Sequence, residues 1–146
     1  MDRLTIMVSS IILSRYRDGL DPNFVGRQKI AEGPLYSVEE VLPLLKTESI
    51  IAWTNKCIKD LQYWSLDTEN IVELIKLAVM KGRYKGSQWC QQKPNGGWAA
   101  CDTYTVIEER WNENTKQSQD TEFYLKFAIG KLGNVILTIS CHPCRI

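Results

Sequence analysis

The sequence lacks the features that mark a membrane protein, a disulfide scaffold or a strongly basic nucleic-acid-binding protein. No apolar run is long enough to span a bilayer. The five cysteines are an odd number and do not indicate a disulfide framework, so they favour a reducing, cytoplasmic location. The net charge is only +1, and any nucleic-acid site would therefore have to be a local patch of charge.

The N-terminal apolar stretch, residues 4–13, does not have the form of a secretory signal. Thr5, Ser9 and Ser10 interrupt it. The bulky run from Arg15 to Arg17 stands where a small-residue cleavage site would follow. The stretch fits a strand or a short helix, and a signal peptide stays open as the alternative.

Composition predicts one globular domain. Hydrophobic residues make up 44% of the 146-residue chain and charged residues 24%, which is the balance of a protein with a packed core. Turn chemistry at Asp18-Gly19 and at Asp21-Pro22-Asn23, followed by Gly33-Pro34, separates residues 1–35 from the rest. We expect residues 1–35 to be an N-terminal extension with a packing role, and residues 36–146 to be the functional domain.

Helix signals are concentrated in the first half of the functional domain. Ser37 and Glu40 form a capping box, and Pro43 should keep the helix that follows short. Thr54 is placed to cap a second helix that reaches about Trp64.

The best-marked helix starts at Asp67 or Thr68 and runs to about Lys81. Apolar residues recur in it at spacings of three and four, which is the period of one helix face. Gly82 is placed to end it.

Strands are expected mainly in the second half. Residues 122–129 and 135–141 alternate apolar and polar positions and are separated by turn residues, which predicts a β-hairpin. Residues 100–108 alternate in the same way, and residues 50–53 predict a brief strand. Polar loops are predicted at 88–98 and 111–121. Helices followed by strands predict an α+β fold, with the N-terminal helices packed on one side of a small antiparallel sheet.

The hairpin places the only histidine in a specific setting. A three-residue loop at 132–134 would pair Lys131 with Val135 and would put Tyr124 directly across from His142. Lys126 would share their face, because side chains alternate along a strand. A one-residue change of register would break this pairing.

Five short elements occur in an order that resembles one protein family. They are Leu66-Asp67 before the long helix, Tyr84-Lys85 with Ser87 behind it, Cys101-Asp102-Thr103-Tyr104, Phe123-Tyr124-Leu125-Lys126 and Ile139-Ser140-Cys141-His142. From about Ser37 onward the chain resembles the MqsR family, mRNA interferase toxins of bacterial toxin–antitoxin systems with a RelE-like or barnase-like fold. The resemblance implies a cytoplasmic, metal-independent endoribonuclease that needs no cofactor, cleaves mRNA and is neutralised by a cognate antitoxin protein.

Four catalytic positions of the family can be carried over to residues of this chain. By resemblance, Lys85 takes the lysine of the Tyr-Lys-Ser element and Tyr124 the tyrosine of the Tyr-Leu-Lys strand. His142 stands where the family has a lysine near its C-terminus, and Cys101 stands where it has a glutamine. The first of these departures is compatible with RNA cleavage, whereas the second puts a contribution from that position in doubt.

The chemistry of metal-free RNA cleavage can be argued from the residues themselves. The 2′-hydroxyl attacks the adjacent phosphate, which requires a base, an acid for the leaving 5′-oxygen and positive charge on the phosphorane. His142 is the only side chain whose ordinary pKa suits proton transfer near neutrality, and Tyr124 is placed to orient or donate a proton. We expect four further residues to bind the substrate, namely Tyr84, Tyr104, Lys126 and Arg145.

Other interpretations compete with the nuclease. The same fold could serve as a noncatalytic RNA- or protein-binding module. Cys141-His142-Pro143-Cys144 contains a C-x-x-C pair that could hold zinc with Cys90 and Cys101, although those two cysteines lack the spacing of a zinc ribbon. Trp89 and Trp98 could stack on bases or simply pack into the protein.

Overall fold

The computed structural model describes residues 11–144. The prediction for residues 4–10 and the substrate-binding prediction for Arg145 lie outside this range.

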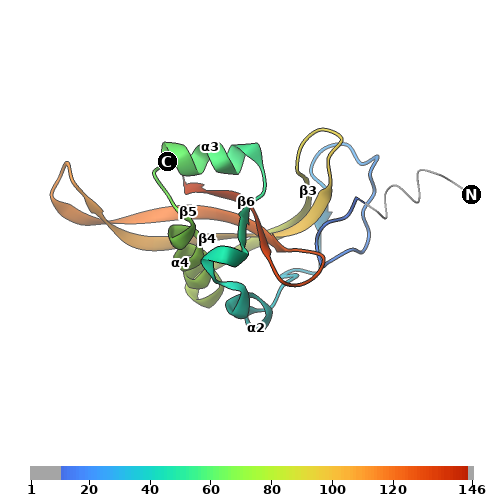
Figure 1. The fold of residues 1–146 in the computed structure, drawn as a ribbon, viewed down its shortest axis with the longest axis horizontal. Helices are drawn as coiled ribbons and strands as arrows, with labels where there is room; N and C mark the ends of the chain where they lie inside the picture. The colour runs from blue at the N-terminus through green and yellow to red at the C-terminus, as the bar shows by residue number, and fades with distance from the viewer. Residues whose placement is uncertain (1–10, 145–146) are drawn as a thin grey trace, which may run out of the picture.

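The described chain forms one six-stranded sheet with helices packed against it (Figure 1). The strand order is β1-β3-β4-β5-β6-β2. The strands are β1 Lys29–Ile30, β2 Ile50–Ala52, β3 Arg83–Gln91, β4 Trp98–Asn112, β5 Gln117–Ile129 and β6 Ile136–Pro143. The architecture is α+β, as predicted. The sheet is mixed and not antiparallel, because β2 runs parallel to β6; a strand of three residues carries no signal for its direction.

The helices begin where their capping residues predict. Ser37 caps α2, Val38–Val41, through a complete capping box, and the helix tightens into a 3-10 turn at Pro43. Thr54 caps α3, Asn55–Tyr63, by accepting a hydrogen bond from the backbone N–H of Cys57. Asp67 caps α4, Thr68–Lys81.

Gly82 ends α4 for a reason other than the expected left-handed turn. Its backbone is extended. A Cβ at this position would lie 2.6 Å from the carbonyl oxygen of Ala78 and 2.9 Å from that of Thr105. Glycine is needed here because the helix end and β4 approach closely.

One face of the sheet carries the main hydrophobic core. α4 contacts β4 and β5, and α3 contacts β6 and β2. The buried side of α4 packs in one cluster with alternate residues of the central strands, among them Tyr104, Val106, Phe123, Leu125, Phe127 and Cys141. The residues between them point to the opposite face, which we call the open face.

Two predicted loops, residues 88–98 and 111–121, are strands at their ends and loops only in the middle. β3 follows α4 after a single residue and continues to Gln91, so only residues 92–97 connect it to β4. β4 and β5 reach Asn112 and Gln117 and are joined by a short turn. Residues 111–121 resemble a loop because nearly all of their side chains are polar, and alternation is visible only where one face is buried. In residues 88–91 the single buried tryptophan, Trp89, is too short a signal to mark a strand.

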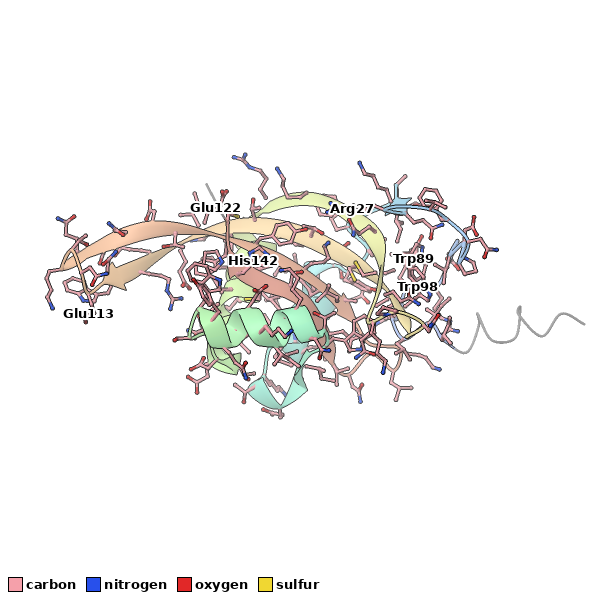
Figure 2. All side chains as sticks on the ribbon, turned by 90° about the horizontal axis from the view of Figure 1, so that it is seen from above. Arg27, Trp89, Trp98, Glu113, Glu122 and His142 are labelled. Atoms are coloured by element: carbon pink, nitrogen blue, oxygen red, sulfur yellow. The ribbon has the colours of Figure 1, made fainter. Side chains whose placement is uncertain are left out.

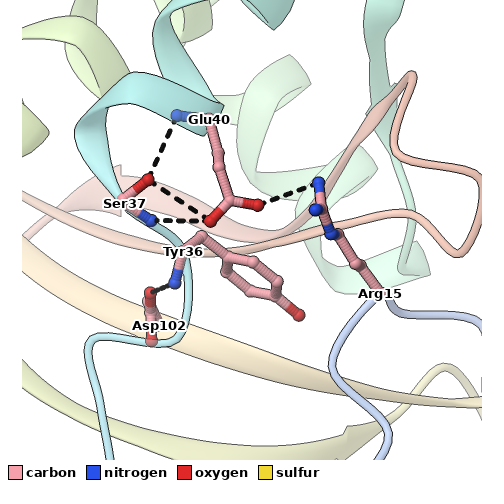
Figure 3. A network of polar contacts seen from close by, with 5 residues as sticks. All are labelled: Arg15, Tyr36, Ser37, Glu40 and Asp102. Carbon is pink, nitrogen blue, oxygen red and sulfur yellow. Dashed lines mark hydrogen bonds and ion pairs between the residues drawn. The ribbon is translucent and has the colours of Figure 1, made fainter.

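The segment before α2 is fastened to the sheet by a buried carboxylate (Figure 3). Asp102 is 0% exposed and accepts hydrogen bonds from the backbone N–H groups of Leu35 and Tyr36 and from the Ser87 hydroxyl. Burial raises the pKa of Asp102, and these hydrogen bonds oppose the shift. An ion pair of 2.8 Å between Arg15 and Glu40 adds a second link.

Residues 11–35 are therefore integrated with the sheet at several points. β1 pairs with β3 at its edge, and Leu13 donates its backbone N–H to the carbonyl of Trp98. Among the described residues, no helix combines the length and the apolar character needed to cross a membrane.

Candidate functional site

Tyr124 and His142 face each other across β5 and β6, as the sequence predicted. Their rings stack with centroids 5.2 Å apart and planes inclined by 19°. The predicted three-residue loop is wrong, because Gly130 donates its backbone N–H to the carbonyl of Val135 and closes a four-residue loop. A β-bulge that places Ile139 between the paired residues shifts the register back. The two differences cancel, so the predicted pairing holds at the site.

Lys85 reaches the open face through a second β-bulge. Tyr84 pairs with Tyr104 and Gly86 pairs with Thr103, which leaves Lys85 as the extra residue. Gly86 has φ +140°, a conformation that favours glycine. Bulges commonly re-aim a side chain beside a functional site, and here the bulge puts Lys85 in the same cavity as Tyr124.

Lys126 is the least expected feature of the open face. Its side chain is 8% exposed, and its Nζ lies 5.6 Å from the centroid of the Tyr124 ring. No carboxylate in the described part of the chain forms an ion pair with it. A buried cation is costly unless a negative charge compensates it, so Lys126 marks a place where an anion would be stabilised.

Two adjoining cavities that share Arg27 and Tyr124 form what we call the cationic groove. The charged and aromatic residues that line it are Arg27, Lys29, Lys56, Lys85, Tyr124, Lys126 and His142. Neither cavity has an aspartate or glutamate in its described lining. Lys56 is ion-paired with Asp60 at 2.7 Å, outside the lining. The local positive charge is therefore much larger than the net charge of the chain.

The backbone fixes which nitrogen of His142 is available for chemistry. Nδ1 lies 2.9 Å from the carbonyl oxygen of Pro143. A carbonyl oxygen can only accept a hydrogen bond, so this contact requires the proton on Nδ1. The neutral ring then has its lone pair on Nε2, which is the nitrogen free to act as a base.

Three cations of the groove were not among the predicted site residues. Arg27 and Lys29 belong to the segment that was expected only to pack, and Lys56 lies on α3. Only the pairing of β1 with β3 brings Arg27 and Lys29 to the open face. Nothing in the sequence near residues 27–29 indicates that pairing, because β1 is two residues long.

Two predicted substrate-binding residues do not line the groove. Tyr104 is 7% exposed and packs between Tyr84 and Phe127 on the core face. The Tyr84 hydroxyl is hydrogen-bonded to Ser87 at 2.6 Å, in the network around Asp102.

The two tryptophans considered for base stacking lie at the end of the molecule away from Glu113 (Figure 2). Trp89 is 4% exposed and lies 6.2 Å from the Tyr16 ring centroid. It therefore packs into a second hydrophobic cluster with Ile12 and Ala100, and its ring is not free to stack on a base.

The cysteines do not assemble the zinc site considered above. Cys141 is buried on the core face, whereas the β3–β4 register places Cys90 and Cys101 on the open face. Among the described residues, no three cysteine, histidine or acidic side chains gather into a potential metal-binding group. Cys101, which stands where the resembling family has a glutamine, is a fully buried thiol. Burial raises its pKa well above the ordinary value.

Cys90 differs from the other cysteines because it lies beside the groove. A hydrogen bond with Cys101 is the main cause that lowers the pKa of Cys90 to about 7, and the charges of Lys126 and Arg27 act in the same direction. Cys144 lies at the other side of the site, where burial and the Glu122 carboxylate raise its pKa.

Comparison with known protein families, with curated proteins and with solved structures identified no match to this chain.

Proposed function

We propose that the cationic groove binds the phosphate backbone of single-stranded RNA and that the protein is a metal-independent endoribonuclease. The observation that carries the proposal is Lys126, a cation 8% exposed without a carboxylate partner among the described residues. It lies in the same cavity as Arg27 and His142. Phosphate is the anion that such a row of cations beside a proton-transfer group suits best.

The groove contains the groups that the reaction needs. Nε2 of His142 would accept the proton of the 2′-hydroxyl as that oxygen attacks the phosphorus. Lys126, Lys85 and Arg27 would stabilise the negative charge of the phosphorane. Tyr124, stacked on His142, would orient the ring and supply the proton to the departing 5′-oxygen. The products would be a 2′,3′-cyclic phosphate and a 5′-hydroxyl end.

The wider identity rests on the family resemblance. In this proposal the protein is a cytoplasmic mRNA interferase of the MqsR type with a RelE-like domain, the toxin of a type II toxin–antitoxin pair. A cognate antitoxin would silence it by covering the groove. Four of the resembling positions support the proposal by their placement, since Lys85, Tyr124, Lys126 and His142 meet on one face.

The test is cleavage of an end-labelled, mixed-sequence RNA by protein treated with a chelator. Three variants accompany the wild type, His142→Ala, Lys85→Gln and Lys126→Gln, each checked by circular dichroism for folding. Lys76→Gln is the matched control, because Lys76 lies on α4 in a different cavity. We expect fragments with cyclic phosphate ends from the wild type and the control, and a large loss in the three groove variants.

Intact RNA in the presence of folded wild-type protein would contradict the nuclease. The second candidate, a noncatalytic RNA-binding module, is favoured by the same Lys126 and would then be tested by binding alone. RNA that neither binds nor is cleaved would overturn both proposals.

A further inference from the structure

The ends of β4 and β5 form a projection that we call the distal ribbon, residues 107–120. β3 begins opposite Thr105, β6 ends opposite Phe123, and Cys144 adds one backbone hydrogen bond to the carbonyl of Glu122. From Val106 and Thr121 outward, β4 and β5 therefore pair only with each other. Figure 1 shows the ribbon extending away from the helices. Glu113 lies at its tip (Figure 2). A two-stranded hairpin has little stability of its own in water, which makes the exposed side chains of the ribbon notable.

The side of the ribbon that continues the open face is apolar and acidic. The β4–β5 register is constant from Asp102 to Asn112, so odd-numbered residues of β4 and even-numbered residues of β5 share one side throughout. Ile107 and Trp111 are each 58% exposed on this side. Glu109 and Asp120 form a directly opposed pair between them, and neither has an ion-pair partner in the described part of the chain.

The same face of the same two strands therefore changes sign along its length. Near the helices it carries the cationic groove, with Tyr124 and Lys126 on β5. Four residues further out from Tyr124 it carries Asp120 and Glu109, a distance of about 13 Å at the usual rise of a strand. The small net charge of the whole chain therefore does not reveal these two opposite patches.

We propose that the distal ribbon docks onto the cationic groove of a second copy of this chain, forming a symmetric dimer. In this dimer the open faces of the two copies face each other. The twofold axis runs between the two sheets, parallel to them and perpendicular to the strands, at the level of Ile107. Rotation about this axis brings each ribbon over the groove of the other copy. The carboxylates of Glu109 and Asp120 then meet groove cations. Trp111 comes to the level of Thr103 and Lys126, where an indole can cover a cation. Because of the twofold symmetry, the same carboxylate–cation contacts form in both halves of the dimer, and the exposed apolar side chains of both ribbons are covered.

The interface is only about two strands wide, so we expect a weak and salt-sensitive dimer. Each groove is covered in the dimer, and an anion that binds the groove competes with it. Docking of the ribbon on the groove does not depend on the proposed nuclease activity.

The experiment is sedimentation velocity of the full chain at protein concentrations up to about 1 mM. We expect the wild type to dimerise at low ionic strength and to dissociate as salt is raised. Reversing the ribbon with Glu109→Lys and Asp120→Lys should abolish the dimer, as should reversing the groove with Arg27→Glu, Lys29→Glu and Lys85→Glu. A control on the exposed side of α4, Glu69→Lys with Glu73→Lys, makes the same charge change and should leave the dimer intact.

Mixing the two reversed proteins gives the sharpest outcome. In the mixture, a positive ribbon meets a negative groove at one end and a negative ribbon meets a positive groove at the other. We expect a mixed dimer to form although neither protein dimerises alone. A wild type that is monomeric at every concentration and salt would overturn the proposal, as would a dimer that survives both reversals or a mixture that fails to associate.

Discussion

The inner and outer halves of the β4–β5 pair share one register but differ in what covers them and in the charge they carry. The inner half has β3 and β6 beside it and a hydrophobic core on one face. The outer half, the distal ribbon, has neither neighbour. On the open face the inner half is lined by cations and the outer half by Glu109 and Asp120. A continuous backbone ladder therefore does not imply one function along its length, because the side chains change where the neighbours end.

The largest expected difference between the halves is catalytic. His142→Ala should lower RNA cleavage by about 100- to 10,000-fold, the usual value of a general acid or base. Trp111→Ala, on the ribbon, should change cleavage by less than about tenfold. Initial rates with one labelled RNA measure both. Equal losses in the two variants would show that the ribbon takes part in the reaction.

The second difference is in stability. Asp102→Ala should cost about 3–5 kcal/mol, because it strands the buried N–H groups of Leu35 and Tyr36 and the hydroxyl of Ser87. Asp120→Ala, the same change on the ribbon, should stay within about 0.5 kcal/mol. Urea denaturation followed by circular dichroism compares the two. A small effect at Asp102 would mean that this network does not fasten the segment before α2.

Two cysteines near the groove differ in pKa, and the groove cations contribute to that difference. With its pKa lowered to about 7, Cys90 is about half thiolate at neutral pH, whereas the raised pKa of Cys144 keeps it almost wholly protonated. The lower intrinsic nucleophilicity of the more acidic thiolate offsets most of that gain. We expect iodoacetamide at pH 7 to modify Cys90 faster than Cys144, with a rate at Cys90 that levels off above its pKa.

Mass spectrometry of the alkylated peptides resolves the two sites. Lys126→Gln should slow the reaction at Cys90, because it removes one of the charges that stabilise the thiolate. Faster modification of Cys144 than of Cys90 would contradict the lowered pKa of Cys90.

The smallest effect is expected from single exposed charges. Lys85→Gln should weaken RNA binding several-fold and reduce the slope of log affinity against log salt by about 1, as for the loss of one phosphate contact. Glu109→Gln, about 13 Å from the middle of the groove along the strands, should change affinity by less than about twofold because salt screens that distance. An equal effect of the two would mean that RNA passes over the ribbon.

The sequence predicts the elements whose signals are local. Capping side chains at Ser37, Thr54 and Asp67 set the helix starts, and alternation set the strands that have one buried face. It does not reveal the polar outer strands, because both of their faces meet water and no period distinguishes them from loops. The parallel direction of β2 depends on contacts distant in the sequence, so no local pattern predicts it.

In the candidate site, too, the features set by local sequence can be predicted, and those set by tertiary packing cannot. The pairing of Tyr124 with His142 follows from a hairpin and is predictable, although the loop was misplaced and the bulge at Ile139 restored the register. The burial of Lys126 and the approach of Arg27 from the first part of the chain depend on tertiary packing. The sequence places Tyr104 in a strand with alternating side chains. Packing of α4 decides which face of the sheet is buried, so the sequence does not show that Tyr104 lies on the core face.

The most direct test of the central claim is a titration with an RNA whose 2′-oxygens are methylated, so that it binds but is not cleaved. Fluorescence anisotropy at several salt concentrations compares the wild type with Lys126→Gln and with the Lys76→Gln control. We predict weaker binding and a shallower salt dependence for Lys126→Gln alone. Identical curves for all three proteins, each shown to be folded, would contradict the assignment of the groove as the RNA site.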